Sequence, residues 1–241
     1  MIIESIDNKK IKDLKKLNQK KYRDIERKYL IEGIHLVLEA YNSGNLLEVV
    51  LLENVDFDYD VNKTYVSKKV MKSLSELDTP YDIIGVCKYS EDNIIGDKIL
   101  MLDNLQDPGN VGTIIRSSLA FNVDTIVLSN NCVDLYNSKV LRAAQGMNFH
   151  INIVREDLKK CIDKLKNEGY IIYTTDVKNG KELKKIKTYD KYVIIMGNEG
   201  NGVSKEISDL SDEKIYINMN NKCESLNVSV ATSIILYELN K

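Results

Sequence analysis

The sequence predicts an α/β protein with two domains. Short apolar runs typical of buried strands alternate with segments whose apolar residues repeat at helical spacing, in both halves of the 241-residue chain. A polar stretch over residues 88–97, with Gly96 and no clear periodicity, separates the two halves. We therefore expect a small domain over residues 1–92, a linker over 93–97 and a larger domain over 98–241.

Charge is distributed unevenly along the chain. The formal net charge is −2, yet residues 1–28 contain ten Lys and Arg against five Asp and Glu. A basic N-terminal arm on an otherwise acidic protein indicates a nucleic-acid partner, although a solvated lysine-rich helix has the same composition.

Composition excludes several classes of protein. The four cysteines have no C-x-x-C spacing, and only two histidines, His35 and His150, are present to complete a metal site, so no metal is expected. No apolar run has membrane-spanning length, and the first residues lack the charged and apolar regions of a signal peptide. We expect a cytoplasmic protein with reduced thiols and no membrane partner.

The first domain is expected to begin with a basic helix and to continue as alternating helices and strands. Ile11, Leu14 and Leu17 recur among lysines in the basic helix, and Ser67 is a candidate N-cap for a later one. The expected elements are a helix over 8–29, a helix over 30–42, a strand over 46–52, a strand at 65–66, a helix over 68–74 and a strand over 82–86.

The second domain has the pattern of a largely parallel sheet with helices on both faces, because helical segments separate short, continuously apolar strands. Pro108-Gly109 marks a turn, and Asn110 is expected to cap the helix that carries Arg116. Such sheets bind ligands beyond the carboxyl ends of their strands. The expected strands are 98–102, 124–128, 152–154, 170–175, 192–197 and 214–217, with further helices ending at 146 and covering 157–168.

The C-terminal segment is expected to be a buried helix with a polar N-terminus. Apolar residues surround most of its circumference between Leu226 and Leu239, whereas Ser225 as N-cap, Asn227 and Ser229 place hydrogen-bonding side chains at its start. This arrangement fits a site at the helix N-terminus. Considered alone, it also fits an ordinary capped core helix.

Three loops carry the residues of chemical interest, and they cover 110–116, 197–204 and 217–227. Gly197, Gly200 and Gly202 in the second loop allow the backbone to approach a ligand closely. Their order matches neither the G-x-x-x-x-G-K-[ST] phosphate loop nor the G-x-G-x-x-G dinucleotide fingerprint.

Taken together, the three loops resemble the signature blocks of the SpoU/TrmH group of SPOUT RNA methyltransferases, in order and in spacing, from about Leu100 to the C-terminus. Residues 8–90, including Tyr29-Leu30-Ile31-Glu32-Gly33, are more loosely similar to the L30e-like RNA-binding domain that precedes the catalytic domain in many members. The matching blocks are Asp107-Pro108-Gly109-Asn110-Val111-Gly112-Thr113-Ile114-Ile115-Arg116, Met196-Gly197-Asn198-Glu199-Gly200-Asn201-Gly202, and Ile217-x-Met219 with Glu224-Ser225-Leu226-Asn227-Val228-Ser229-Val230-Ala231.

The resemblance implies a SPOUT domain, with a parallel sheet flanked by helices and a deep trefoil knot, preceded by a small L30e-like α/β domain. It implies S-adenosylmethionine as cofactor, bound within the knotted region, and a homodimer paired through the catalytic domain. Carried over position by position, it assigns cofactor contacts to Thr175, Gly197, Ile217, Met219 and Leu226. It assigns positions around the target ribose to Asn110, Arg116, Glu199, Ser225 and Asn227.

The implied reaction transfers a methyl group to a ribose 2′-hydroxyl of RNA, with rRNA favoured by the L30e-like domain and tRNA as the alternative. Arg116, with an arginine pKa above ~12, is poorly suited to accept the hydroxyl proton. Its guanidinium is instead expected to bind the adjacent phosphate and to stabilise negative charge on the 2′-oxygen, while the proton acceptor stays open.

Two residues depart from the family pattern. Asn218 stands where members usually have proline, and Asn221 stands where they usually have glycine. Asparagine tolerates a left-handed backbone better than most residues, and Asn218 restores an N–H that proline lacks.

Two other functions stay open, a non-catalytic RNA-binding or ribosome-assembly factor on the same scaffold and methylation of a base. The intact polar residues around Arg116 favour the enzyme.

Overall fold

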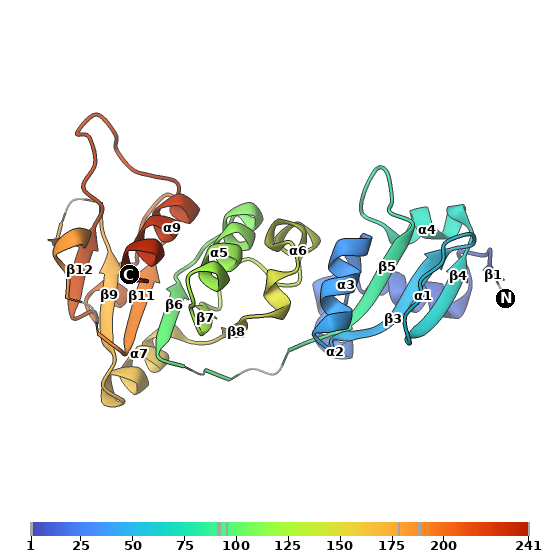
Figure 1. Cartoon of the computed structure of the whole chain (residues 1–241), viewed down its shortest axis with the longest axis horizontal. Helices are drawn as coiled ribbons and strands as arrows, with labels where there is room; N and C mark the ends of the chain where they lie inside the picture. The colour runs from blue at the N-terminus through green and yellow to red at the C-terminus, as the bar shows by residue number, and fades with distance from the viewer. Residues whose placement is uncertain (1, 91–92, 95, 178, 188, 241) are drawn as a thin grey trace. The chain divides into compact units, whose positions relative to one another are not determined.

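The chain folds into two compact units in a computed structural model that describes residues 2–90, 93–94, 96–177, 179–187 and 189–240 (Figure 1). One unit comprises Met1–Glu91 together with Asp134–Phe149, and the other comprises Asp92–Val133 and His150–Lys241. Residue 95 of the predicted linker lies outside the described residues, and the predicted domain boundaries stay a prediction.

The described part of the first unit contains a five-stranded sheet in the order β1-β4-β3-β5-β2. β5 runs antiparallel to β2 and β3, whereas the other neighbours pair in parallel. Alternate residues of β3 point to opposite faces, so that Val50 packs in one core and Val49 in the other. The strands are β1 Ile2–Ile3, β2 Lys28–Glu32, β3 Leu46–Leu52, β4 Asn62–Val66 and β5 Ile83–Lys88.

Helices cover both faces of this sheet. α1 (Lys9–Lys16) and α4 (Lys68–Leu74) pack beside each other on the Val50 face, and α3 (Ile34–Asn42) packs on the other face. The buried residues Ile11 and Leu14 of α1 belong to the first of these cores. The amphipathic pattern of the basic segment is therefore explained by packing, with its lysines left on the outer side.

The expected helices over 8–29 and 30–42 are wrong in their boundaries. The first is two helices, α1 and α2 (Lys20–Glu26), and residues 28–32 form strand β2. Gly33 has a φ of 97°, which ends the strand and lets the chain turn into α3. Pairing of β2 with β5, which is distant in sequence, overrides the local helical pattern.

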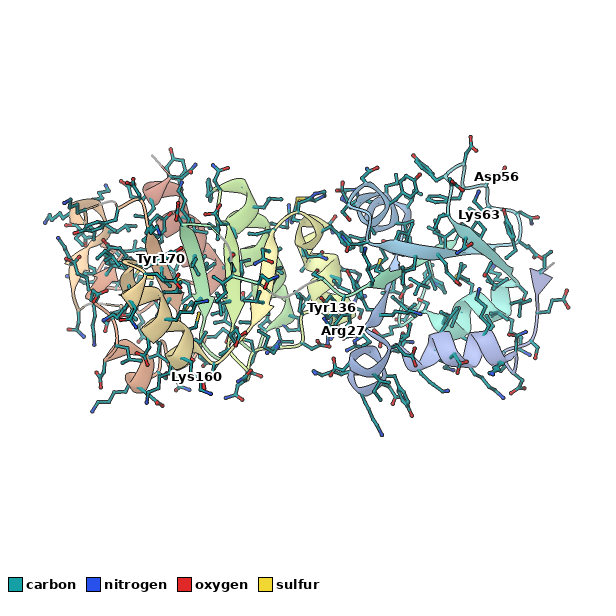
Figure 2. The ribbon with its side chains drawn as sticks, turned by 90° about the horizontal axis from the view of Figure 1, so that it is seen from below. Arg27, Asp56, Lys63, Tyr136, Lys160 and Tyr170 are labelled. Atoms are coloured by element: carbon teal, nitrogen blue, oxygen red, sulfur yellow. The ribbon has the colours of Figure 1, made fainter. Side chains whose placement is uncertain are left out.

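Residues 134–149 from the middle of the chain belong to the first unit. Arg23 forms a buried ion pair with Asp134, at 2.5 Å between Nη2 and Oδ2. The Tyr136 ring stacks on Tyr89 at a centroid distance of 3.9 Å; Tyr136 is labelled in Figure 2 beside Arg27, whose guanidinium lies over the Tyr89 ring. This segment contains α6, Ser138–Ala144, and a 3₁₀ turn over Met147–Phe149.

The described part of the second unit contains a seven-stranded sheet whose pairings are all parallel, in the order β10-β12-β9-β11-β6-β7-β8. The parallel sheet predicted from the sequence is confirmed. The short pair formed by β10 with β12 was not expected. The strands are β6 Lys98–Leu102, β7 Thr125–Leu128, β8 Asn152–Arg155, β9 Ile171–Thr175, β10 Lys181–Glu182, β11 Tyr192–Met196 and β12 Glu213–Tyr216.

Helices pack against this sheet and against each other. α7 (Leu158–Asn167) packs with alternate strand residues such as Ile99 and Val193 in one core. α5 (Pro108–Ala120) and α9 (Val228–Leu239) pack against each other, and α8 (Lys205–Ser208) and a 3₁₀ turn over Leu183–Lys185 complete the unit. The trefoil knot stays an expectation. Among the described residues, no helix is long and apolar enough to span a membrane.

Candidate active site

A cavity of about 640 Å³ lies where the carboxyl ends of β9, β11 and β12 meet the N-terminus of α9. This is the edge of a parallel sheet at which ligands bind. The five residues assigned to the cofactor all line it. They are Thr175 at the end of β9, Gly197 after β11, Ile217 and Met219 after β12, and Leu226 before α9.

The wall formed by the loop after β11 is main chain folded back on itself. Asn198 and Gly202 exchange two backbone hydrogen bonds of 2.9 Å each, which closes the loop. A Cβ atom at position 197 would lie 2.0 Å from the carbonyl carbon of Gly202 and 2.0 Å from the nitrogen of Val203. Only glycine at position 197 therefore allows this close approach.

The charge of the lining restricts the ligand. Two carboxylates, Asp176 and Glu199, line the cavity, and no Lys, Arg or His is among the described residues that do so. A polyphosphate would find no cation there, whereas a nucleoside-sized ligand with a positive charge meets a favourable field. The volume lies within the range of small-molecule sites, and the surrounding apolar side chains and exposed main chain suit an adenosine group.

Three polar side chains from the three motif segments form one hydrogen-bonded network beside the cavity. Asn110 Nδ2 donates to Glu199 Oε1 at 3.2 Å, and Asn227 Nδ2 donates to Asn110 Oδ1 at 2.9 Å. Glu199 also accepts hydrogen bonds from the backbone N–H groups of Gln106 and Asp107, at 3.4 and 3.2 Å. The Glu199–Asn110–Asn227 network therefore joins segments that are distant in sequence.

The helix caps differ from the expectation, and the difference explains the network. Asp107 is the N-cap of α5, because its Oδ1 accepts the N–H of Asn110 at 2.8 Å. Asn110 is therefore not the cap, and its amide is available to Glu199 and Asn227. The helix begins one turn earlier than the sequence predicts, because Pro108 occupies the first helical position, which proline favours as much as a turn.

The N-terminus of α9 is likewise shifted. Asn227 is its N-cap, accepting the N–H groups of Ser229 at 2.9 Å and Val230 at 3.3 Å, so the helix begins at Val228. Ser225, expected to be the cap, lies in the preceding loop and lines the cavity. Asn221 does not have a positive φ, so it does not replace the family's glycine by adopting a left-handed backbone.

The prediction that the last helix is buried is wrong for one of its faces. Ser229, Thr232, Ile235, Leu236 and Leu239 are buried. Val230, Ile234 and Tyr237 are 47%, 38% and 59% exposed in the single chain. They recur at three- and four-residue spacing and so form one stripe, because α5 covers only part of the circumference of α9.

Arg116 lies on the exposed side of α5. It makes no hydrogen bond or ion pair with any described residue, and it does not line the cavity of its own chain. It follows Asn110 by six residues, which is about 9 Å along an α-helix.

Sequence reasoning missed Asp176, which lines the cavity directly after β9. Its position at a strand end is the signal that could have identified it.

The pKa of Glu199 is lowered from its usual value of 4.5. Burial raises the pKa, but hydrogen bonds to the carboxylate from its own backbone N–H, from the Asn110 amide and from the backbone of Asp107 and Gln106 outweigh that effect. Glu199 is therefore ionised at neutral pH and is a poor proton acceptor there. Its position suits it to organise the Asn110 amide.

Protonation of Glu199 is expected to weaken the site in acid. Because its folded-state pKa is depressed, the carboxylate stabilises the fold above its unfolded pKa, and this contribution is lost as the pH falls through the folded pKa. Thermal unfolding should show Glu199→Gln less stable than the unsubstituted protein at pH 7, with the difference shrinking as the pH falls below the usual glutamate pKa of 4.5 and through the lower folded-state pKa. Glu206→Gln, at an exposed position on α8, is the matched control. A difference that grows in acid would contradict this role.

Comparisons with known proteins agree over almost all of the chain. A family model described as the SpoU rRNA Methylase family matches residues 97–237, and one described as an MRM3-like substrate binding domain matches residues 8–85. The 23S rRNA (guanosine(2553)-2′-O)-methyltransferase RlmP of Bacillus subtilis is 38% identical, over 98% of both chains.

Solved structures show the same likeness. The structure of a putative RNA methyltransferase of the TrmH family from Porphyromonas gingivalis has a TM-score of 0.87 at 25% identity and covers 98% of both chains. The AdoMet-bound rRNA methyltransferase from Sinorhizobium meliloti has a TM-score of 0.86 at 26% identity and covers 99% of this chain and 97% of its own.

Proposed function

The chain belongs to the SpoU rRNA methylase family, and from this premise we propose that it transfers a methyl group from S-adenosylmethionine to a ribose 2′-hydroxyl of ribosomal RNA. The observation that carries the proposal is the meeting of three motif segments beside one cavity, which two of them line. Asn110, Glu199 and Asn227 are joined there by hydrogen bonds although they lie far apart in the sequence.

The cavity fits the cofactor. Gly197, Ile217 and Leu226 would hold it largely through main chain, with Thr175 and Met219 beside it. The acidic lining favours a positively charged ligand over an anionic one. When bound, S-adenosylmethionine supplies a methyl group activated by a sulfonium.

The chain's own side chains position the acceptor rather than remove its proton. Arg116 is too basic to take the proton of the 2′-hydroxyl, and its role is to bind the phosphate beside the target ribose and to stabilise charge developing on the oxygen. Glu199 is committed to the N–H groups around it. The Glu199–Asn110–Asn227 network would orient the ribose, and the proton leaves to the RNA phosphate or to water.

The protein acts as a homodimer in this proposal. The exposed stripe of Val230, Ile234 and Tyr237 on α9 is apolar and lies beside α5, the helix that carries Arg116. A second copy that covers this stripe would bury it, as isologous pairing does in most homodimers. Arg116 would then act at the cavity of the partner copy, since it does not line its own.

A charge placed in the stripe is expected to prevent the dimer. Ile234→Glu should convert the protein from dimer to monomer, because an unpaired carboxylate would be buried in the interface. Sedimentation velocity or light scattering measures the change. Ile25→Glu, at an exposed apolar position on α2, is the control and should stay dimeric. A dimeric Ile234→Glu variant would place the interface elsewhere.

A basic face of the first unit supports the RNA partner. α1 carries five lysines and one aspartate, and α4, which packs beside it, carries three lysines and no acid. On a protein with a net charge of −2, this concentration of cations suits the phosphate backbone of RNA. We propose that RNA binds first to this α1–α4 face.

Removing cations from the α1–α4 face is expected to weaken RNA binding without affecting the chemistry. The double variant Lys15→Glu, Lys68→Glu should raise the KM for RNA at unchanged kcat and reduce the salt dependence by about 0.7 to 0.9 in log–log slope per lost phosphate contact. Lys160→Glu on α7, labelled in Figure 2, is the control for charge reversal elsewhere. Equal effects of both changes would contradict the assignment.

The target can be tested directly. Unmethylated 23S rRNA from a Bacillus subtilis strain that lacks RlmP is incubated with the protein and radiolabelled S-adenosylmethionine, with tRNA from the same strain in parallel. We expect labelling of the 23S rRNA, and nuclease digestion should place the methyl on ribose. Labelling of tRNA alone would show that tRNA is the substrate, and a methyl group on a base would show that the reaction is base methylation. RNA binding without labelling would support a non-catalytic factor.

A further inference from the structure

Arg155, the last residue of β8, has its guanidinium inside a ring of backbone carbonyl groups away from the cavity. Nη1 donates to the oxygens of Ser129 at 2.7 Å, Cys132 at 3.0 Å and Asn130 at 3.2 Å, and Nη2 donates to that of Val133 at 2.7 Å. All four acceptors belong to the one loop that follows β7. Within the described residues, no carboxylate forms an ion pair with Arg155.

This contact determines the conformation of the β7 loop, residues 129–133. Four carbonyl dipoles that point at one place repel one another unless a cation lies between them. The planar guanidinium of Arg155 supplies several donors in a fixed geometry, and hydrogen bonds from a charged donor are stronger than neutral ones. Without it, the loop would have to turn its carbonyl groups outward.

The β7 loop in turn supports the segment that leads into α5. The Asn104 N–H donates to Ser129 Oγ at 2.9 Å, and the Val133 N–H donates to the Leu105 carbonyl at 2.9 Å. The side-chain amide of Gln106 also donates to a carbonyl of the β7 loop. Residues 104–106 are thus bound to the loop at three successive positions.

The same segment holds Glu199 on its other side. The backbone N–H groups of Gln106 and Asp107 donate to the Glu199 carboxylate, which accepts the Asn110 amide. Asn198 adds a hydrogen bond of 2.8 Å from its side chain to the carbonyl of Asn104. A continuous series of contacts therefore runs from Arg155 to the side chain that would face the ribose.

We propose that Arg155 is a positioning residue for methyl transfer, which acts through the β7 loop and residues 104–107 on the Glu199–Asn110–Asn227 network. The proposal rests on the proposed function. The five lining residues assigned to the cofactor, Thr175, Gly197, Ile217, Met219 and Leu226, take no part in this series of contacts, so cofactor binding should not depend on Arg155. The predicted signature is a loss in kcat with unchanged affinity for S-adenosylmethionine.

Kinetics of Arg155→Ala and Arg155→Lys on the unmethylated 23S rRNA test this signature. A shift of the network of about 1 Å should lower kcat by roughly 10- to 100-fold. Arg155→Lys keeps the charge but not the planar guanidinium, so its kcat should lie between that of Arg155→Ala and that of the unsubstituted protein. Isothermal titration should give an unchanged Kd for S-adenosylmethionine. Lys159→Gln, which removes an exposed cation of the same unit, should leave all values unchanged.

Chemical rescue separates positioning from a general loss of structure. Free guanidinium at low millimolar concentration should restore part of the kcat of Arg155→Ala, whereas sodium chloride and urea at equal concentration should not. An unchanged kcat, or a parallel loss of cofactor affinity without rescue, would overturn the proposal. Hydrogen exchange adds a readout that needs no turnover, because the amides of Gln106 and Asp107 should exchange faster in Arg155→Ala. Absence of turnover in the unsubstituted protein would count against the proposed function alone.

Discussion

Replacing Arg116 with alanine is expected to lower kcat for methyl transfer by about 10²- to 10³-fold, the usual effect of removing one donor that stabilises a developing oxyanion. S-adenosylmethionine should still bind, because Arg116 does not line the cavity of its own chain. Arg116→Lys should recover only part of the rate, since a lysine keeps the charge but cannot bind phosphate with two parallel N–H groups.

Single-turnover methylation of the 23S rRNA probe, with the cofactor Kd from isothermal titration, measures both effects. Thr113→Ala, three residues earlier on the exposed side of α5, is the control. If Arg116→Ala turns over at the unsubstituted rate, its assignment to the ribose is wrong.

The proposed placement of Arg116 at the partner's cavity has its own test. Mixing Arg116→Ala with a variant that cannot bind cofactor creates dimers in which one copy supplies the arginine and the other supplies the cavity. Methylation by the mixture above that of either variant alone is expected. The absence of recovery, with subunit exchange verified, would locate Arg116 at the cavity of its own chain.

Much of the second unit can be predicted from the sequence because its signals are local. Strands such as β6 and β11 are continuously apolar, and the all-parallel pairing is confirmed. Ligand sites in such sheets lie at the carboxyl ends of the strands, and the cavity is found there. Thr175, Gly197 and Ile217 line it as the motif positions imply, because each follows or ends a strand that the sequence predicts.

What the sequence does not reveal depends on contacts between distant residues. The strand character of β2 comes from its pairing with β5, and only Gly33 marks its end locally. Residues 134–149 belong to the first unit through contacts between distant residues, such as the buried pair of Arg23 and Asp134, which lie 111 positions apart, and the stacking of Tyr136 on Tyr89. Neither periodicity nor spacing contains that information.

The same limit applies to polar side chains in the site. Asn110 is a plausible cap from its sequence position, but Asp107 takes that role and leaves Asn110 for Glu199. Arg155 is a single arginine at the end of strand β8, and nothing in the neighbouring sequence shows that four carbonyl groups converge on it. Side-chain roles set by the folded backbone become visible only when the loops are seen together.

Adding one methyl group at position 197 is expected to damage the proposed cofactor cavity more than the same addition at position 200 of the loop after β11. The Cβ of Gly197→Ala would lie 2.0 Å from backbone atoms of Gly202 and Val203, which cannot move aside as a flexible side chain would. The two hydrogen bonds between Asn198 and Gly202 would have to break or the strand end shift. Overpacking of about 1–3 kcal/mol corresponds to roughly 10- to 100-fold weaker binding of S-adenosylmethionine.

Gly200→Ala is the matched control for Gly197→Ala, because its Cβ would meet only the side-chain oxygen of Asn198, at 3.6 Å, an ordinary contact. It should bind S-adenosylmethionine as the unsubstituted protein does. Isothermal titration compares the variants, and thermal unfolding shows whether Gly197→Ala still folds. A folded Gly197→Ala variant with unchanged affinity would mean that this loop does not form the cofactor wall. Equal losses in both variants would mean that loop flexibility, rather than the close approach at position 197, controls binding.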